Sequence, residues 1–290
     1  MLWLAATLFA AATALHRPQP EVLFAIQQDG NSQGPYSPDK LAIEPVAMIT
    51  KLPGPCPGCL KLRIDPPPEG HEFEARYFRP GRTYHVLDGG AEIGTVKVTK
   101  LTSLGCVSLA ASVDVTSRSN WDQYLFSVLA VGSLHLAPVS PGRRVPDDDE
   151  DKALRKIAEQ ELRAKGVSES MLTKMEGEAN ISTDLDHDGH RDLIGSFSTN
   201  DGKDQRRTYN IFLIAMGDAS GGFHAEHVWY FTYAGDAGED KGVVDTIDLD
   251  EDGTDEIVVR RGFYESYEYE ILKRAGNKWK SVYRGGGSGC

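Results

Sequence analysis

Two nine-residue segments of this chain follow one acidic pattern, Asp-x-Asp-x-Asp-Gly-x-x-Asp/Glu. They cover residues 184–192 and 248–256, and an aliphatic pair follows each of them, Leu193-Ile194 and Ile257-Val258. Each segment holds at least four carboxylates, whose charges repel one another unless a cation lies between them. Calcium takes about six to eight oxygen ligands at roughly 2.3–2.6 Å, which suits a short acidic loop. The pattern therefore predicts two calcium-binding loops.

The metal ligands can be assigned by position in the pattern. The three alternating aspartates offer side-chain oxygens, and the glycine permits a sharp turn that other residues resist. The residue after the glycine offers its backbone carbonyl, and the carboxylate at the ninth position completes the shell. The first segment supplies Asp184, Asp186, Asp188, His190 and Asp192. The second segment supplies Asp248, Asp250, Asp252, Thr254 and Glu256.

An EF-hand and a plain surface turn are the two alternatives to this assignment. An EF-hand loop needs a bidentate Glu at position 12, where this chain has Gly195 and Val259. Strand-like sequence, and not a helix, follows each segment. Asp-Gly pairs also mark ordinary acidic turns. Two copies that share an apolar second position and an acidic ninth position favour the metal site over the plain turn.

The pattern resembles the FG-GAP and VCBS-type repeats of integrin-α-like propellers and of many secreted bacterial proteins. In those families the nonapeptide links two strands of a β-unit and binds calcium. The resemblance covers residues 178–290 and implies a calcium-stabilised β domain, often with an extracellular binding role. It does not imply an enzyme, because fold and function are separate inferences. With two copies, and about four to eight blades in a closed propeller, a complete propeller is not expected.

Each acidic segment begins a longer repeat unit. The strands predicted after the first segment are 193–197, 209–215 and 227–231, and those after the second are 257–260, 267–272 and 279–283. Turn sequences such as 217–222 and 275–278 separate them. Each unit thus reads as loop, strand, turn, strand, turn, strand. Two such units can pack face to face or form one sheet.

The first residues predict export from the cell. Residues 1–14 form an apolar run that ends in Ala12-Thr13-Ala14, which is typical of a signal peptide cleaved after Ala14. The run is too short to span a bilayer, so no transmembrane segment is expected after its removal. We therefore predict a secreted or periplasmic protein.

The cysteine content agrees with an oxidising compartment. Cys56, Cys59, Cys106 and Cys290 make an even number, and the sequence leaves their connectivity open. The first two have the spacing of a redox dithiol, but they lie in a proline-rich stretch. That setting favours a structural disulfide.

The N-terminal region, residues 20–142, predicts a small β barrel or sandwich. Its strand candidates are 74–78, 83–87, 94–98 and 107–111, followed by an apolar stretch at 125–136. Residues 147–166 then form an acidic linker and an amphipathic helix whose apolar face is Leu154, Ile157, Ala158 and Leu162. With the C-terminal domain at 178–290, the fold class is mainly β.

No catalytic motif is evident. His224 and His227 lie three residues apart on a predicted strand, where side chains face opposite sides, which argues against a zinc site. The aromatic residues of the last unit fit either a sheet core or a recognition surface. They are Phe263, Tyr264, Tyr267, Tyr269 and Trp279.

A net charge of −12 without basic clusters argues against nucleic acid and anionic membranes as partners. Three function classes remain. The leading hypothesis is a non-enzymatic secreted calcium-binding protein whose partner is an extracellular protein or a glycan. A secreted hydrolase with structural calcium and an active site in the N-terminal domain is the second, and a cell-envelope assembly component is the third. Converging catalytic side chains in a pocket would favour the hydrolase.

Overall fold

The chain has 290 residues, and the computed structural model describes residues 20–28, 41–55, 60–104, 107–118, 128–132, 142–202, 207–235 and 238–289. The predicted signal peptide and all four cysteines lie outside these ranges. Within them the protein is mainly β-structure, as the sequence predicts.

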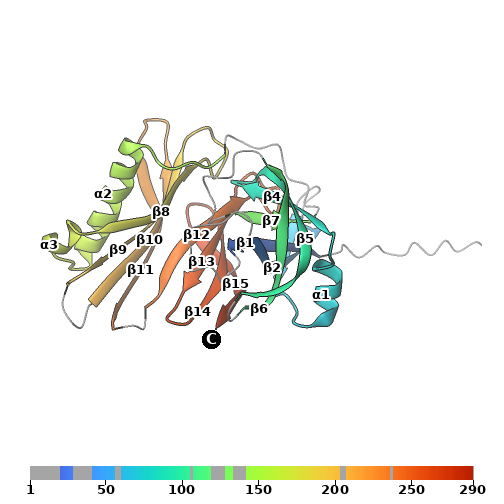
Figure 1. The fold of residues 1–290 in the computed structure, drawn as a ribbon. Helices are drawn as coiled ribbons and strands as arrows, with labels where there is room; N and C mark the ends of the chain where they lie inside the picture. The colour runs from blue at the N-terminus through green and yellow to red at the C-terminus, as the bar shows by residue number, and fades with distance from the viewer. Residues whose placement is uncertain are drawn as a thin grey trace, which may run out of the picture.

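Six strands of the N-terminal region close into an antiparallel barrel (Figure 1). They are β1 (Glu21–Gln28), β2 (Leu41–Pro53), β4 (Thr83–Asp88), β5 (Ala91–Leu104), β6 (Val107–Arg118) and β7 (Leu129–Val131). The strand order is β1-β7-β4-β5-β6-β2, and pairing of β1 with β2 closes the ring. A further strand, β3 (Leu60–Asp65), pairs with the second half of β2. Of the two predicted architectures, the barrel is the one that forms.

The strand predicted at residues 74–78 is wrong, because these residues belong to helix α1 (His71–Tyr77) and its end. The prediction rested on a short alternation of apolar and charged residues. Phe73 and Tyr77, however, lie about one helical turn apart and share one face of a helix. Both side chains are buried in the barrel core together with Phe78. Burial of these three aromatic rings favours the helix over the strand.

Two four-stranded antiparallel sheets follow in the C-terminal half. The first unit contains β8 (Glu176–Thr183), β9 (Asp192–Asn200), β10 (Arg207–Gly217) and β11 (Phe223–Ala234). The second unit contains β12 (Asp240–Ile247), β13 (Glu256–Gly262), β14 (Ser266–Arg274) and β15 (Trp279–Gly289). The three strands predicted after each acidic segment are confirmed. Strands β8 and β12, which precede the segments, were not among the strands predicted from the residue pattern.

The predicted amphipathic helix is α2 (Asp148–Ala164), and a short helix, α3 (Glu169–Leu172), follows it. Asp147 caps α2 by accepting the N–H groups of Asp149 at 3.1 Å and Glu150 at 3.0 Å. The Glu150 side chain accepts the N–H of Asp147 in return at 2.9 Å. This reciprocal pair is a capping box, which explains why the acidic run begins a helix.

The elements stack in the order helices, first unit, second unit, barrel (Figure 1). The predicted apolar face of α2 packs on one face of the first unit through Leu154, Ala158 and Leu162. The other face of the first unit packs on the second unit, and the far face of the second unit packs on the barrel. Of the two predicted arrangements of the repeat units, face-to-face packing is the one observed.

Equivalent positions in the two units can be read from the strand register. Leu193, the first residue after the first acidic segment, pairs with Ala215. Ile257, the first residue after the second, pairs with Leu272. The dipeptide 216–217, Met-Gly, is therefore equivalent to the dipeptide 273–274, Lys-Arg.

Candidate metal centres

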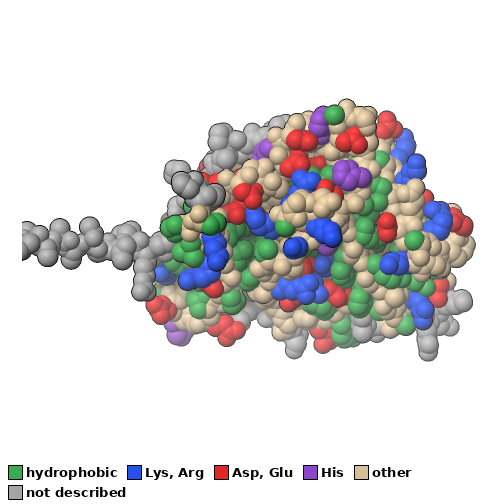
Figure 2. All heavy atoms as spheres, turned by 180° about the vertical axis from the view of Figure 1, so that it is seen from behind, with side chains coloured by type: hydrophobic (Ala, Val, Ile, Leu, Met, Phe, Trp, Pro, Cys, Tyr) green, Lys and Arg blue, Asp and Glu red, His purple; other side chains and the backbone are tan. Residues whose placement is uncertain are grey.

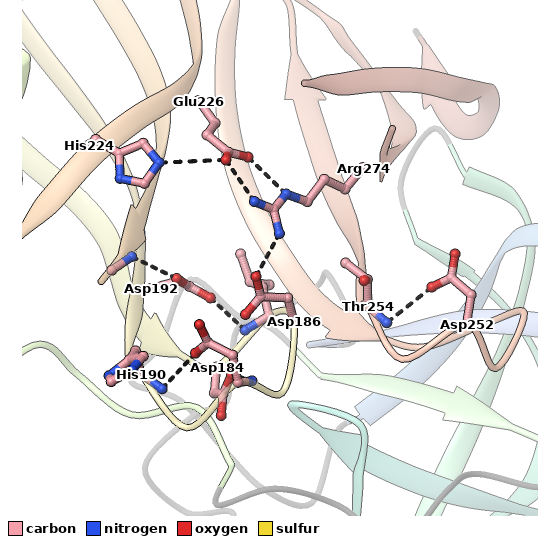
Figure 3. Close-up of polar contacts among 12 residues, drawn as sticks. Asp184, Asp186, His190, Asp192, His224, Glu226, Asp252, Thr254 and Arg274 are labelled. Carbon is pink, nitrogen blue, oxygen red and sulfur yellow. Dashed lines mark hydrogen bonds and ion pairs between the residues drawn. The ribbon is translucent and has the colours of Figure 1, made fainter. Parts of the chain in front are cut away.

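Loop 1 (residues 184–192) connects β8 to β9, and loop 2 (residues 248–256) connects β12 to β13. The loops are direct neighbours, and Figure 3 shows residues of both in one view. Asp255 of loop 2 donates its backbone N–H to the carbonyl of Leu185 in loop 1 at 2.7 Å. Its carboxylate lies 3.0 Å from Nε2 of His187. The two candidate centres thus belong to different sheets but share a border.

Both loops have the same backbone conformation. Their fourth residues, His187 and Glu251, have φ angles of 55° and 60°. Their glycines, Gly189 and Gly253, have φ angles of 89° and 84°. Glycine adopts such angles without the steric penalty of a Cβ atom, which is why the pattern requires it at this position.

The first aspartate of each loop holds the turn together. The two carboxylate oxygens of Asp184 accept the N–H groups of Asp188 at 3.1 Å and Gly189 at 3.0 Å. Asp248 accepts the matching pair of N–H groups in loop 2, also at 3.1 and 3.0 Å. These bonds orient one carboxylate toward the interior of each turn.

The alternating aspartates of each loop converge, as predicted. One carboxylate oxygen from each of Asp184, Asp186 and Asp188 lies within 4.8 Å of the other two, and the corresponding aspartates of loop 2 do the same. Within the described ranges, these two trios are the only groups of three potential metal ligands gathered so closely. The three alternating aspartates of each loop are therefore brought together, whereas the ninth-position carboxylates Asp192 and Glu256 are not part of either trio.

Asp186 provides a test of whether a cation fits loop 1. Its Oδ2 accepts a hydrogen bond from Arg274 at 2.6 Å, whereas its Oδ1 is buried and accepts none. A buried polar oxygen without a partner is unfavourable by roughly 1–3 kcal/mol. A hard cation at the focus of the three carboxylates would satisfy it. The residues present fit a calcium ion.

The carboxylates at the ninth position close the loops. Asp192 accepts the N–H of Leu185 at 2.7 Å and that of Gly217 at 2.8 Å. Glu256 accepts the N–H of Leu249 at 2.8 Å. Burial raises the pKa of Asp192 to about 7, and the other loop carboxylates add to the shift. A carboxylate oxygen that accepts one hydrogen bond has a second lone pair with which it can bind a metal. That Asp192 and Glu256 are metal ligands remains a prediction.

His190 and Thr254 were predicted to bind the metal through their carbonyls. Their backbone N–H groups donate to Asp188 at 2.8 Å and to Asp252 at 3.0 Å (Figure 3). These bonds fix the backbone just before each carbonyl. The part played by the carbonyls themselves stays a prediction.

The leucines at the second position anchor the loops in the cores. Leu185 is fully buried between the first and second units. Leu249 is fully buried between the second unit and the barrel. An ion that stiffens either loop would therefore also stabilise the packing between two layers.

Lys273 reaches into loop 2 from the end of β14 and was not among the residues predicted for this site. Its Nζ lies 2.8 Å from Asp250, 2.8 Å from Asp252 and 2.6 Å from Glu256. Burial lowers the pKa of Lys273, but hydrogen bonds to these three carboxylates outweigh that effect and raise it above the ordinary lysine value.

Arg274, the next residue, reaches the other loop because successive side chains of a strand face opposite sides. Figure 3 shows its guanidinium between Glu226 of β11 and Asp186 of loop 1. It donates to Glu226 at 2.9 and 2.7 Å and to Asp186 at 2.6 Å. The sequence contained one signal for these two contacts. Lys273 and Arg274 are adjacent basic residues at the end of a strand, where the first unit has Met216 and Gly217.

The border between the loops holds the contact between His187 and Asp255. Burial raises the pKa of the Asp255 carboxyl to about 6, while its hydrogen bond with His187 opposes this shift. Burial lowers the pKa of His187, but the contact with Asp255 prevails and raises it above the ordinary value. A charged imidazole at this place would strengthen the contact between the units.

His224 and His227 do not face opposite sides of β11, contrary to the prediction from the residue pattern. A bulge in β11 pairs His227 with Ile214 and Ala225 with Ala215, which places both histidines on the same face. They still do not converge. His224 lies 3.6 Å from Glu226, whereas the His227 ring packs near Phe212.

The aromatic residues of the second unit divide between two roles. Tyr269 and Trp279 are buried on opposite faces of the sheet, and Tyr267 is half-buried beside Tyr269. Phe263 and Tyr264, between β13 and β14, are exposed. The sheet-core interpretation therefore holds for Tyr267, Tyr269 and Trp279 and not for Phe263 and Tyr264.

One cavity beside the barrel contains two carboxylates. It has a volume of about 210 Å³, and Glu44 and Glu69 line it together with Gly286 and Gly287. Glu44 accepts hydrogen bonds from Tyr267 at 2.5 Å and from Tyr269 and Gln27. Both of its oxygens therefore join the barrel to the second unit, which is a structural role.

Comparison of the chain with protein-family models, curated proteins and solved structures finds no match. The resemblance to FG-GAP and VCBS-type repeats thus stays a prediction carried by the loop pattern. Among the described residues, no helix combines the length and the apolar composition that a membrane crossing requires.

Proposed function

We propose that loops 1 and 2 bind calcium and that this protein is a secreted or periplasmic calcium-binding protein with a binding or structural role. The observation that carries the proposal is the convergence of three carboxylates in each of two loops with the same backbone conformation. The buried, unpartnered Oδ1 of Asp186 supports it, because such an oxygen calls for a cation.

Calcium suits the loops better than magnesium does. Its larger shell accepts oxygens in a flexible arrangement, whereas magnesium demands a tight octahedron and retains several waters. The loops offer carboxylates of differing burial, with Asp184 buried, Asp186 half-buried and Asp188 exposed. An exposed position leaves room for water in the shell. Magnesium should therefore substitute poorly.

The proposed role of the ion is to hold the layers together. Each loop places a buried leucine between its own sheet and the next layer. Neutralising the carboxylates would relieve repulsion within the loop and keep that leucine in place. Because the ion would bind the folded state and not the unfolded chain, it would stabilise the fold.

An extracellular protein or a glycan is the partner class that we propose. The exposed pair Phe263 and Tyr264 supports it, because aromatic side chains are frequent anchors in recognition. Figure 2 shows a face on which basic, acidic and hydrophobic side chains are interspersed. A face of mixed charge does not favour a polyanionic partner.

Thermal unfolding with and without calcium tests the proposal. Calcium at one hundred times its Kd should stabilise the protein by roughly 2.7 kcal/mol per site, and a chelator should reverse the shift. The double variant Asp186→Ala/Asp250→Ala should lose most of the response.

The matched control is Asp114→Ala/Glu176→Ala, which removes two exposed carboxylates outside the loops. This control should keep the calcium response. An undiminished response in the Asp186→Ala/Asp250→Ala variant would refute the assignment of the loops.

A further inference from the structure

Loop 2 already contains a cation of its own. The ammonium of Lys273 contacts three carboxylates of the loop, those of Asp250, Asp252 and Glu256, at 2.6–2.8 Å. Two of them, Asp250 and Asp252, are among the aspartates that converge in this loop. The ammonium therefore lies against oxygens that a calcium ion would need.

Loop 1 has no such residue at the equivalent position. The register that equates Ala215 with Leu272 places Met216 where the second unit has Lys273. Met216 is buried in the apolar core between the two units. The two loops therefore share a backbone conformation but differ in the charge that the neighbouring strand brings to them.

Arg274 does not play the part of Lys273 in loop 1. It contacts Asp186 through Oδ2, and two other bonds of its guanidinium go to Glu226. The second oxygen of Asp186, Oδ1, stays buried and without a donor. Loop 1 thus has a charged neighbour at its border but keeps an oxygen that only a further ligand can satisfy.

We propose that Lys273 is a resident cation of loop 2, so that loop 1 is the high-affinity calcium site and loop 2 binds calcium only by expelling this ammonium. The inference rests on the proposed function, because it assumes that the loops bind calcium. Expulsion is possible, since the Lys273 side chain is 25% exposed and can turn toward water. Loop 2 would then keep an ammonium among its converging aspartates when calcium is scarce, whereas loop 1 would keep the unpartnered Oδ1 of Asp186.

Calorimetric titration of calcium into single-loop variants tests the inference. Asp186→Ala leaves loop 2 as the intact site, and Asp250→Ala leaves loop 1. We expect the Asp250→Ala protein to bind calcium more tightly than the Asp186→Ala protein, by roughly tenfold or more, because calcium in loop 2 must first displace an ammonium that pairs with three carboxylates.

Lys273→Met then gives loop 2 the residue that the first unit has at this position. Added to Asp186→Ala, it should tighten calcium binding by roughly tenfold, because it removes an ammonium that pairs with three carboxylates of the loop. The matched control is Lys280→Met. Lys280 pairs with Lys273 across β14 and β15, and it forms no ion pair within the described part of the chain. This control changes the net charge equally and should leave the affinity of loop 2 unchanged.

Equal affinities of the two single-loop variants would overturn the inference while the calcium proposal stands. The same holds if Lys273→Met tightens binding no more than Lys280→Met does. If neither the unmodified protein nor any variant binds calcium, both proposals fail. The comparison of the two single-loop variants does not require Lys273→Met, so the inference remains testable if that variant does not fold.

Discussion

The molecule has two junctions between layers, one between the two units and one between the second unit and the barrel. Both contain a buried leucine from the second position of an acidic loop, but their surroundings differ. Leu185 occupies the first junction and Leu249 the second. The residue at the fourth loop position also contacts the next layer in both cases. His187 lies 3.0 Å from Asp255 of the second unit, and Glu251 lies 2.5 Å from Lys51 of the barrel. Both loops therefore contact the next layer through the same two positions, the second and the fourth, whether that layer is a repeat unit or the barrel.

The two junctions differ in their buried polar groups. At the barrel, Glu44 accepts bonds from two tyrosines, and Arg143 contacts Asp88 of the barrel and Asp245 of β12. Between the units, Ser196 and Asn210 donate to the backbone carbonyls of Lys241 and Glu239, and Arg274 pairs with Glu226 near the loops. Buried polar networks fix one orientation because an unpaired member is costly. On the calcium proposal, an ion in loop 1 would add to the contacts between the units, whereas the barrel junction has buried ion pairs of its own.

The largest effect is expected from truncating the anchors. Leu185→Ala and Leu249→Ala should each lower the free energy of unfolding by about 2–5 kcal/mol, the range for a buried leucine replaced by alanine. Urea denaturation measures this change. Leu101→Ala, at a position that is 50% exposed, is the control and should have little effect. A loss below about 1 kcal/mol at either loop position would contradict the anchoring role.

A smaller effect is expected from the pH dependence of the barrel junction. Burial raises the pKa of Asp245 to about 7, well above the ordinary value of 3.8, and Arg143 opposes this shift. The folded state therefore binds more protons than the unfolded state between these values. Stability from this group should fall as pH rises from about 4 to about 7, by at most about 1.4 kcal/mol per pH unit.

Asp245→Asn should remove that slope, and denaturation at several pH values measures the difference between the variant and the unmodified protein. Other carboxylates titrate equally in both proteins and cancel in the comparison. If the two proteins lose stability in parallel as the pH rises, Asp245 does not titrate in this range.

The elements that the sequence predicts correctly are those with strong local signals. Glycine and aspartate mark both loops, and short apolar runs bounded by turn residues mark the three strands after each loop. Strand β8, by contrast, is mostly polar, and its residues Glu176 and Glu178 gave no strand pattern. Helix α1 was misread because seven residues are too few to separate the two periodicities.

The parts of the candidate centres that could not be predicted are contacts between distant residues. Lys273 follows loop 2 by about two strands, and its approach to Asp250 depends on how β14 pairs with β13. The contact of Arg274 with Asp186 joins different sheets, so it depends on how the units stack. The bulge that turns His224 to the side of His227 is likewise invisible in the residue pattern.

A crystal structure of the protein grown with calcium chloride tests the central claim most directly. The account predicts an ion at the focus of Asp184, Asp186 and Asp188, with about six to eight oxygens at roughly 2.3–2.6 Å, including Oδ1 of Asp186. An ordered loop 1 that holds water at this focus, or aspartates that point apart into solvent in saturating calcium, would contradict it.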